Sequence, residues 1–230
     1  MRNNKRSLIG NDVIEEAANG VISAYYLNNH RASIIPPIPI EDIAEYFLGY
    51  SIEITNEGVF SDADLLGGIC FETNTIYVNH SIEFHDGRYA FTIAHEIGHH
   101  ILHREEYLSA TEETNREILC RETGAKPQIE IEADRFAAAL LMPADCLVKA
   151  VKDIRTKQNI SSIGQARGLA NRLIKEHGFN NVSNTAMINR LIELELISGK
   201  LRFQDGLRTF RSNRFRMYCV IRDKLRRIFS

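Results

Sequence analysis

Two stretches of the chain carry apolar residues at the three- and four-residue spacing of an amphipathic helix. The first runs from Arg88 to His103, with alanine and isoleucine along one face. The second runs from Ile129 to Pro143 and contains a run of alanines. Small residues on that run, with Gly98 opposite, would let the two helices approach closely. The pattern therefore predicts two tightly packed helices around which the rest of the chain is organised.

Shorter patterns surround these helices. Alternating residues at 50–54 predict a strand, and residues 66–71 and 75–79 predict two more strands joined as a hairpin. Further helices are expected at 12–28, 40–48, 144–154, 162–177 and 184–197, the first of them with Asp12 as its N-cap. The elements together predict an α+β fold, with a small mixed sheet packed on the first of the two long helices.

The first long helix contains the sequence His95-Glu96-x-x-His99. Residues four apart on a helix lie one above the other, about 6 Å apart along its axis, so both imidazoles can turn toward one ion. Glu96 directly follows His95 and can contact a water on that ion without ligating it. The spacing therefore supplies two zinc ligands and a general base on one surface.

A zinc hydrolase typically uses three protein ligands and leaves a fourth position for water. His103 lies eight residues from His95, roughly 12 Å along the axis, so it cannot share an ion with both histidines of the motif. A carboxylate on the second long helix is therefore expected. Glu132 is the predicted third ligand, because it shares a face with Phe136 and would carry its charge into the interior, where a metal would satisfy it. Glu130 is assigned to another side of the helix.

Several polar residues leave alternatives open. Asp134 fits two roles equally well, a partner for a ligand histidine or a solvated carboxylate in the first helical turn. Tyr107, His177 and Arg190 are candidates for stabilising an oxyanion. The polar segment 104–128, with a short helix expected near 112–120, is interpreted as a solvated connector in preference to a mobile cover over the site.

Composition and charge narrow the class of protein. Hydrophobic residues make up 44% and charged residues 25% of the 230 residues, which is typical of a soluble globular protein. The chain contains no apolar run of ~18 residues and no recognisable secretory signal. Its four cysteines are scattered, as is typical of free thiols in a reducing cytosol, so a cytoplasmic location is expected.

The net charge of −2 conceals an asymmetry. Residues 200–230 hold ten Lys or Arg against two Asp, a balance of +8, which leaves −10 for the residues before them. This basic tail could dock an acidic protein, nucleic acid or a membrane surface. Its apolar residues equally suit a packed hairpin and helix with a solvated basic face, and nucleic acid is the less favoured partner.

The two central segments also carry a family resemblance. Phe91 to His103, followed by Glu132 to Pro143, is similar to the two signature segments of the ImmA/IrrE family of metallo-endopeptidases. The resemblance extends over roughly Pro36 to Ser198. It implies a zincin-like, gluzincin-type fold, and in such folds the strand beside the site helix, here 66–71, pairs with an extended substrate.

The resemblance also implies roles for individual residues. One Zn²⁺ per chain would be held by His95, His99 and Glu132, with Glu96 as the catalytic base. Characterised members cut or inactivate helix-turn-helix repressors, so the expected function is a zinc endopeptidase that hydrolyses such a repressor and derepresses genes. The alternative is a regulator that binds or sequesters a repressor without cutting it, with a structural or vestigial zinc site.

The expected domain organisation follows from these patterns. The chain is divided into a disordered start at 1–10, a metallopeptidase domain at 11–143, a helical subdomain at 144–199 and the basic extension at 200–230. The helical subdomain resembles a helix-turn-helix, with Asn184, Thr185, Asn189 and Arg190 on its candidate recognition face. Glu193 and Glu195 would repel phosphates there, so a packing hairpin is predicted instead of a DNA reader.

Overall fold

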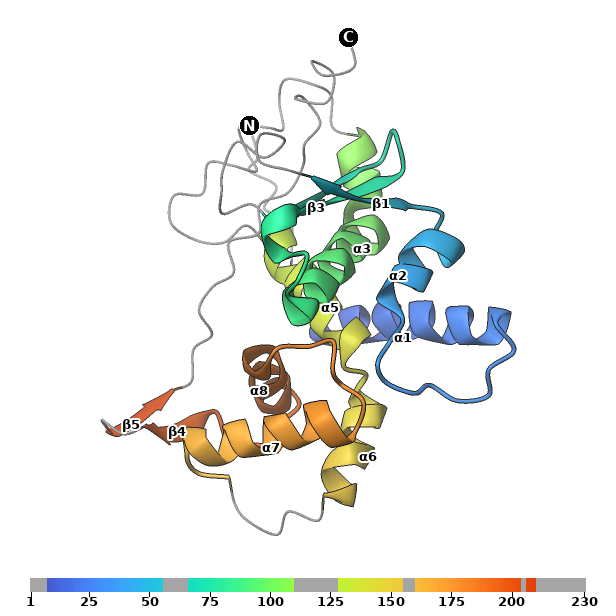
Figure 1. Cartoon of the computed structure of the whole chain (residues 1–230). Helices are drawn as coiled ribbons and strands as arrows, with labels where there is room; N and C mark the ends of the chain where they lie inside the picture. The colour runs from blue at the N-terminus through green and yellow to red at the C-terminus, as the bar shows by residue number, and fades with distance from the viewer. Residues whose placement is uncertain (1–7, 56–65, 110–127, 155–159, 204–205, 210–230) are drawn as a thin grey trace.

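Two long helices, α3 (Asp86–Ser109) and α5 (Gln128–Leu141), pack against each other at the centre of the molecule (Figure 1). The computed structural model describes residues 8–55, 66–109, 128–154, 160–203 and 206–209. The other elements are α1 (Asn11–Asn28), α2 (Ile40–Asp42) continued by a π-helical turn (Ile43–Phe47), β1 (Ser51–Thr55), β2 (Gly67–Cys70), β3 (Thr75–Asn79), a 3-10 turn (His80–Ile82), α6 (Ala144–Asp153), α7 (Ile163–Glu176), α8 (Asn184–Glu193), β4 (Lys200–Phe203) and β5 (Gly206–Thr209).

The contact between α3 and α5 is close because glycine faces alanine. A methyl group added at Gly98 would lie 3.2 Å from both the Cα and the carbonyl oxygen of Ala133, and 3.2 Å from a ring carbon of Phe136. These distances are tighter than ordinary van der Waals contact, so a larger residue at position 98 would require the neighbouring atoms to shift by a few tenths of an ångström. The prediction that Gly98 and the alanines bring the helices together is confirmed.

The three-stranded sheet lies against α3 and has the order β1-β3-β2. β2 and β3 form the predicted antiparallel hairpin, whereas β1 runs parallel to β3, so the sheet is mixed. Ile69, Ile76 and Val78 are buried between the sheet and the helices. The mixed α+β class and the packing of the sheet on the first long helix are confirmed, and among the described strands β2 lies at an edge of this sheet.

The chain before α1 is partly ordered, which corrects two predictions. Gly10 is the N-cap residue of α1 and no side chain caps this end, so Asp12 lies inside the first turn and not at the cap. The predicted disordered start covers 1–10, but the Ile9 amide donates a hydrogen bond to Glu132. Arg135 donates another to Asn11, so the start of α1 is held against α5; residues 1–7 lie outside the described ranges.

Beyond α5, the chain forms the predicted helical segment. Ser162 caps α7 through a capping box, and α7 packs against α8. Arg190 is buried in α8, where it pairs with Glu15 and Glu193 and donates to the Met142 carbonyl oxygen. A guanidinium held in this way is turned into the protein and not toward DNA, which agrees with a packing hairpin.

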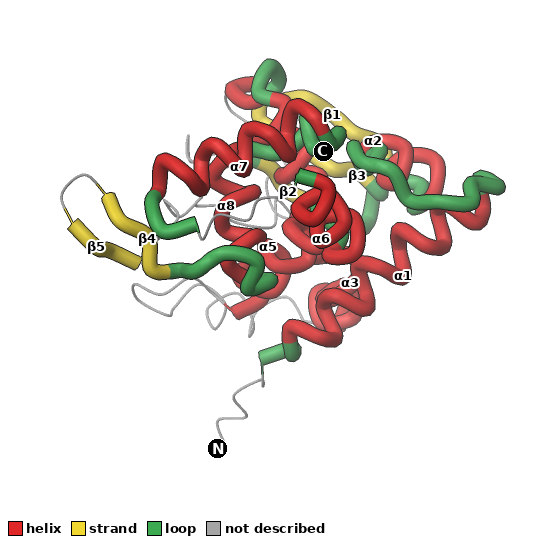
Figure 2. Tube along the Cα trace, turned by 90° about the horizontal axis from the view of Figure 1, so that it is seen from below, coloured by secondary structure: helices red, strands yellow, loops and turns green. Residues whose placement is uncertain are grey.

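The start of the basic extension is the β4–β5 hairpin, which lies beside α7 at the periphery of the molecule (Figure 2). Residues 210–230, and the predicted helix near 112–120, lie outside the described part of the chain. Cys70 and Cys146 are free thiols, as predicted; Cys120 and Cys219 are not described. Among the described residues, no helical stretch combines the length with the hydropathy needed to cross a bilayer.

The α3–α5 contact predicts a position-specific effect of side-chain volume. Gly98→Val places a branched side chain against the backbone of α5, and we expect it to lower the free energy of unfolding by about 1–3 kcal/mol. Gly20→Val is the matched control, because Gly20 lies exposed in α1 with no atom near its added methyl group. Chemical denaturation should show a lower midpoint for Gly98→Val alone; equal midpoints would contradict the packing argument.

Candidate active site

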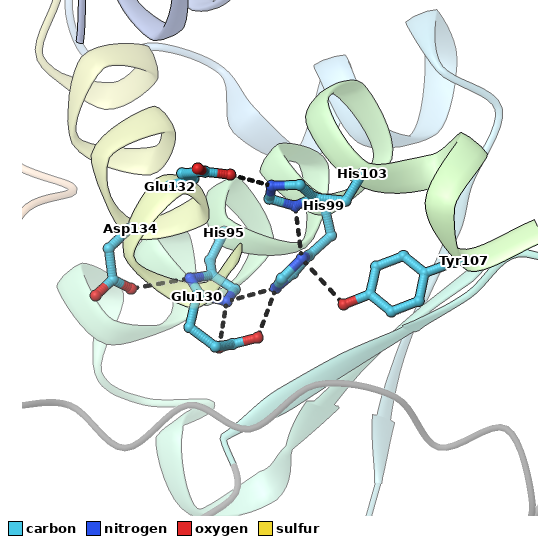
Figure 3. A network of polar contacts seen from close by, with 7 residues as sticks. All are labelled: His95, His99, His103, Tyr107, Glu130, Glu132 and Asp134. Carbon is cyan, nitrogen blue, oxygen red and sulfur yellow. Dashed lines mark hydrogen bonds and ion pairs between the residues drawn. The ribbon is translucent and has the colours of Figure 1, made fainter. Parts of the chain in front are cut away.

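The two histidines of the motif converge in the interior of the protein (Figure 3). His95 and His99 lie one turn apart on α3, and their Nε2 atoms are 2.9 Å from each other. A carboxylate from α5 completes the group, because Glu130 places one oxygen 3.3 Å from His95 Nε2 and the other 3.2 Å from His99 Nε2. All three side chains are buried.

One ligand atom from each of the three residues lies within 4.8 Å of the others, close enough for one metal ion. Bonds of about 2.0–2.1 Å from zinc to nitrogen or oxygen put neighbouring ligand atoms roughly 3.3 Å apart. Two imidazole nitrogens and one carboxylate are also the ligand types that zinc favours. His95, His99 and Glu130 therefore form a candidate site for one metal ion, and they are the group of potential ligands that converges within the described part of the chain.

Glu130 replaces Glu132 as the candidate third ligand. Glu132 is fully buried, as predicted, but its carboxylate lies 3.0 Å from His103 Nε2 and accepts the Ile9 amide. Its charge is thus satisfied by protein groups on the far side of the histidines, and no metal is needed to explain its burial. Glu130, assigned from the sequence to another side of the helix, is the glutamate that faces both histidines of the motif.

The close approach of the helices explains this correction. Ala133 is the α5 residue whose backbone approaches Gly98, and Gly98 lies between His95 and His99 on α3. Glu130 is three residues before Ala133, so it lies on the same face of α5, one turn away. The spacing from Ala133 identifies Glu130 only once the structure shows that Ala133 meets Gly98, because the direction of burial alone does not separate the two glutamates.

Asp134 contacts the first ligand histidine from behind. Its carboxylate lies 3.0 Å from His95 Nδ1, which supports the first of its two predicted roles. A carboxylate can only accept, so His95 donates from Nδ1 to Asp134, and its Nε2 is the ring nitrogen that faces His99 and Glu130. This is the common arrangement of a metal-bound histidine with an outer carboxylate.

Glu96 is a buried acid with an unsatisfied oxygen. Its Oε2 is buried and has no hydrogen-bond partner among the described residues. Burial raises the pKa of Glu96 to about 8, and the charge on nearby His95 offsets part of this effect. The start of β2 lies against the same region, because a methyl group added at Gly67 would collide with Thr92 and approach Glu96 Oε1 within 3.6 Å.

The protein side chains alone leave the cluster charged. Burial lowers the pKa of His95, but contacts with Asp134 and Glu130 outweigh burial and raise that pKa to about 10. Burial lowers the pKa of His99 despite its contact with Glu130. Burial would raise the pKa of Glu130, yet the two histidines hold it well below its usual range. Glu130 is thus a carboxylate, and His95 carries the positive charge that a metal ion would replace.

The three candidates for stabilising an oxyanion lie in different places in the structure. Tyr107 reaches the histidines, but its hydroxyl lies 3.5 Å from His99 Nδ1, on the side of the ring away from the converging Nε2 atoms. Arg190 is engaged in its ion pairs with Glu15 and Glu193. His177 ends α7 as its C-cap residue, and its role stays a prediction.

A mixed α+β fold with H-E-x-x-H on one helix and a carboxylate from a second defines a metallopeptidase-like protein. A family model described as Peptidase_M78, the IrrE N-terminal-like domain, matches residues 49–173, more than half of the chain. The chain therefore belongs to this ImmA/IrrE family of metallopeptidases. The matched segment includes α3 and α5, whereas α1 and α8 lie outside it. No curated protein matches the chain significantly.

The geometry predicts different effects for two glutamates on the same helix. Glu130→Gln removes a charged candidate ligand, so we expect the purified protein to lose its tightly bound zinc. Glu132→Gln keeps an oxygen that can accept from His103 and removes no candidate ligand, so we expect it to retain about one zinc ion per chain when zinc is supplied in equimolar amount. Metal analysis after gel filtration measures both. Retention by Glu130→Gln with loss by Glu132→Gln would restore Glu132 as the ligand.

The charge on His95 predicts that zinc binding expels a proton. The pKa of His95 is raised to about 10, so below that pH its imidazole must lose a proton before it can bind a metal. Zinc affinity should therefore rise with pH between pH 6 and pH 8. Calorimetry at pH 7 in buffers of different ionisation enthalpy should detect release of at least about one proton per zinc.

Asp134→Asn is the control for this proton release. Without the neighbouring negative charge, the pKa of His95 should fall, and fewer protons should leave on zinc binding at pH 7. Zinc binding by the unaltered protein without any proton release would show that His95 is neutral before the metal arrives.

Proposed function

We propose that the protein is a zinc-dependent endopeptidase that uses His95, His99 and Glu130 as metal ligands and Glu96 as general base. The observation that carries the proposal is the convergence of three ligand atoms beside a buried carboxylate with an unsatisfied oxygen. A purely structural zinc site takes four protein ligands and needs no base beside it. Three ligands with an adjacent free carboxylate oxygen instead suit hydrolysis.

In this mechanism, the bound zinc ion would polarise the scissile carbonyl and make a water molecule acidic near neutral pH. Glu96 accepts the proton of the attacking water at Oε2 and later delivers it to the leaving nitrogen. Its burial suits both steps, because a pKa raised toward neutral pH lets the same carboxyl group accept a proton and release it again. Asp134 keeps the proton of His95 on Nδ1 throughout.

The edge strand β2 is the proposed docking place for the substrate backbone. β2 pairs with β3 on one side, and its start lies over Thr92 and Glu96. An extended peptide can add to such an edge through main-chain hydrogen bonds, which requires little of its side chains. A protein segment laid along β2 would pass close to Glu96, which supports a peptide-bond substrate.

The substrate class is part of the proposal and is supported by the family resemblance. Characterised members of the ImmA/IrrE family cut or inactivate helix-turn-helix repressors, so we propose a transcriptional repressor in the cytoplasm as the substrate and derepression of its genes as the outcome. The non-proteolytic alternative, in which the protein only sequesters a repressor, needs no reactive base. The unsatisfied Oε2 of Glu96 therefore favours cleavage.

Comparison of new protein N-termini tests the proposal. Cells expressing the unaltered protein and cells expressing Glu96→Gln at equal levels are compared by mass spectrometry. Glu96→Gln removes the base without removing a ligand, so we expect it to bind zinc and to produce none of the new termini. The unaltered protein should produce new termini within a helix-turn-helix repressor.

His99→Ala provides the second comparison, because it removes a ligand and should lose both zinc and cleavage. Induction of the repressor's target genes by Glu96→Gln, with no new termini in any sample, would establish the sequestering regulator in place of the peptidase. Equal zinc content in His99→Ala and the unaltered protein would show that the metal assignment is wrong.

A further inference from the structure

A second buried polar pair lies behind the metal-facing histidines (Figure 3). His103 Nε2 lies 3.0 Å from Glu132 Oε2, and His103 Nδ1 lies 3.1 Å from His99 Nδ1. None of these three side chains is more than 1% exposed. They form a continuous chain of contacts, from Glu132 through His103 to His99, that the hydrolytic mechanism above does not use.

The hydrogen-bond chemistry of each group decides which one donates and which one accepts in these contacts. Glu132, as a carboxylate, can only accept, so His103 donates from Nε2. An imidazole that carries its single proton on Nε2 offers a lone pair at Nδ1. His99 therefore donates its Nδ1 proton to His103, and its own Nε2 is left with a lone pair. That Nε2 is the atom that faces His95 and Glu130.

The N-terminal segment holds the far end of the chain of contacts. The Ile9 amide donates to Glu132 Oε1 at 2.8 Å, while Glu132 Oε2 faces His103. Arg135 donates to Asn11 at 2.7 Å and keeps the start of α1 against α5. Both carboxylate oxygens of Glu132 thus face donors from fixed positions. Ile9 and α1 lie outside the segment 49–173 that the family model matches, so these contacts with Glu132 and Arg135 come from a part of the protein that the family model does not cover.

We propose that His103 and Glu132 are positioning residues that fix His99 in the tautomer and orientation that present Nε2 to the metal. Asp134 fixes the tautomer of His95 by a direct hydrogen bond. Glu132 fixes that of His99 indirectly, through the ring of His103. Outer hydrogen bonds of this kind typically raise metal affinity 10–100-fold. The inference rests on the proposed function, because it requires a zinc ion at His99 Nε2.

Competition with a fluorescent zinc chelator tests the inference. His103→Phe keeps the volume of an aromatic ring but offers no acceptor to His99, and we expect it to weaken zinc binding about 10–100-fold. His103→Gln supplies one acceptor and one donor at about the spacing of the two ring nitrogens, so it should restore most of the affinity. Restoration by Gln separates hydrogen bonding from packing, because a purely structural role would not need the polar atoms.

Tyr107→Phe is the matched control, because its hydroxyl lies 3.5 Å from the same His99 Nδ1 and is too distant for a strong hydrogen bond. We expect this variant to bind zinc as tightly as the unaltered protein. Equal affinity in His103→Phe and the unaltered protein would overturn the inference. So would an equal loss in His103→Gln and His103→Phe.

Nitrogen-15 NMR of histidine side chains in the zinc-loaded, unaltered protein tests, without a mutation, which nitrogens donate in the hydrogen bonds from His99 through His103 to Glu132. We expect His103 to carry its proton on Nε2 and His99 to carry its proton on Nδ1. A proton on His103 Nδ1 would overturn the inference while leaving the peptidase proposal intact. Failure of the unaltered protein to bind zinc would instead overturn both.

Discussion

The close packing of α3 on α5 is the constraint on which the candidate site depends. Glycine at position 98 lets the backbone of α3 approach Ala133 to within contact distance. A site that draws two ligands from one helix and one from another needs a separation that is small and repeatable, because zinc tolerates only a narrow range of bond lengths. The same contact that stabilises the core thus also sets the distance from Glu130 to the histidines.

This arrangement places many polar side chains in the core. His95, Glu96, His99, His103, Glu130 and Glu132 are all buried between the two helices. Buried charges are tolerated when each one is paired or hydrogen-bonded. Carboxylates from α5 and the Ile9 amide just before α1 contribute to that pairing, so α5 and the start of the described chain support the side chains of α3.

Glu96 stands apart from this pattern, because its Oε2 has no hydrogen-bond partner among the described residues. A buried oxygen without a partner destabilises a folded protein unless a ligand or reactant satisfies it. Glu96 lies one residue beyond a candidate ligand and close to the start of the edge strand β2. This position gives the destabilising burial of its oxygen a functional explanation. The fold accepts an unfavourable local environment at the place where proton transfer would occur.

The sequence by itself determined the elements and the motif. Apolar spacing predicted α3, α5 and the β2–β3 hairpin, and His95-Glu96-x-x-His99 needs only the geometry of one helix to align its side chains. Only the tertiary structure decided which α5 glutamate meets the histidines, because that depends on the rotation of one helix against another. Burial is common to Glu130 and Glu132, whereas the contact at Gly98 turns Glu130 toward His95 and His99 and leaves Glu132 to His103.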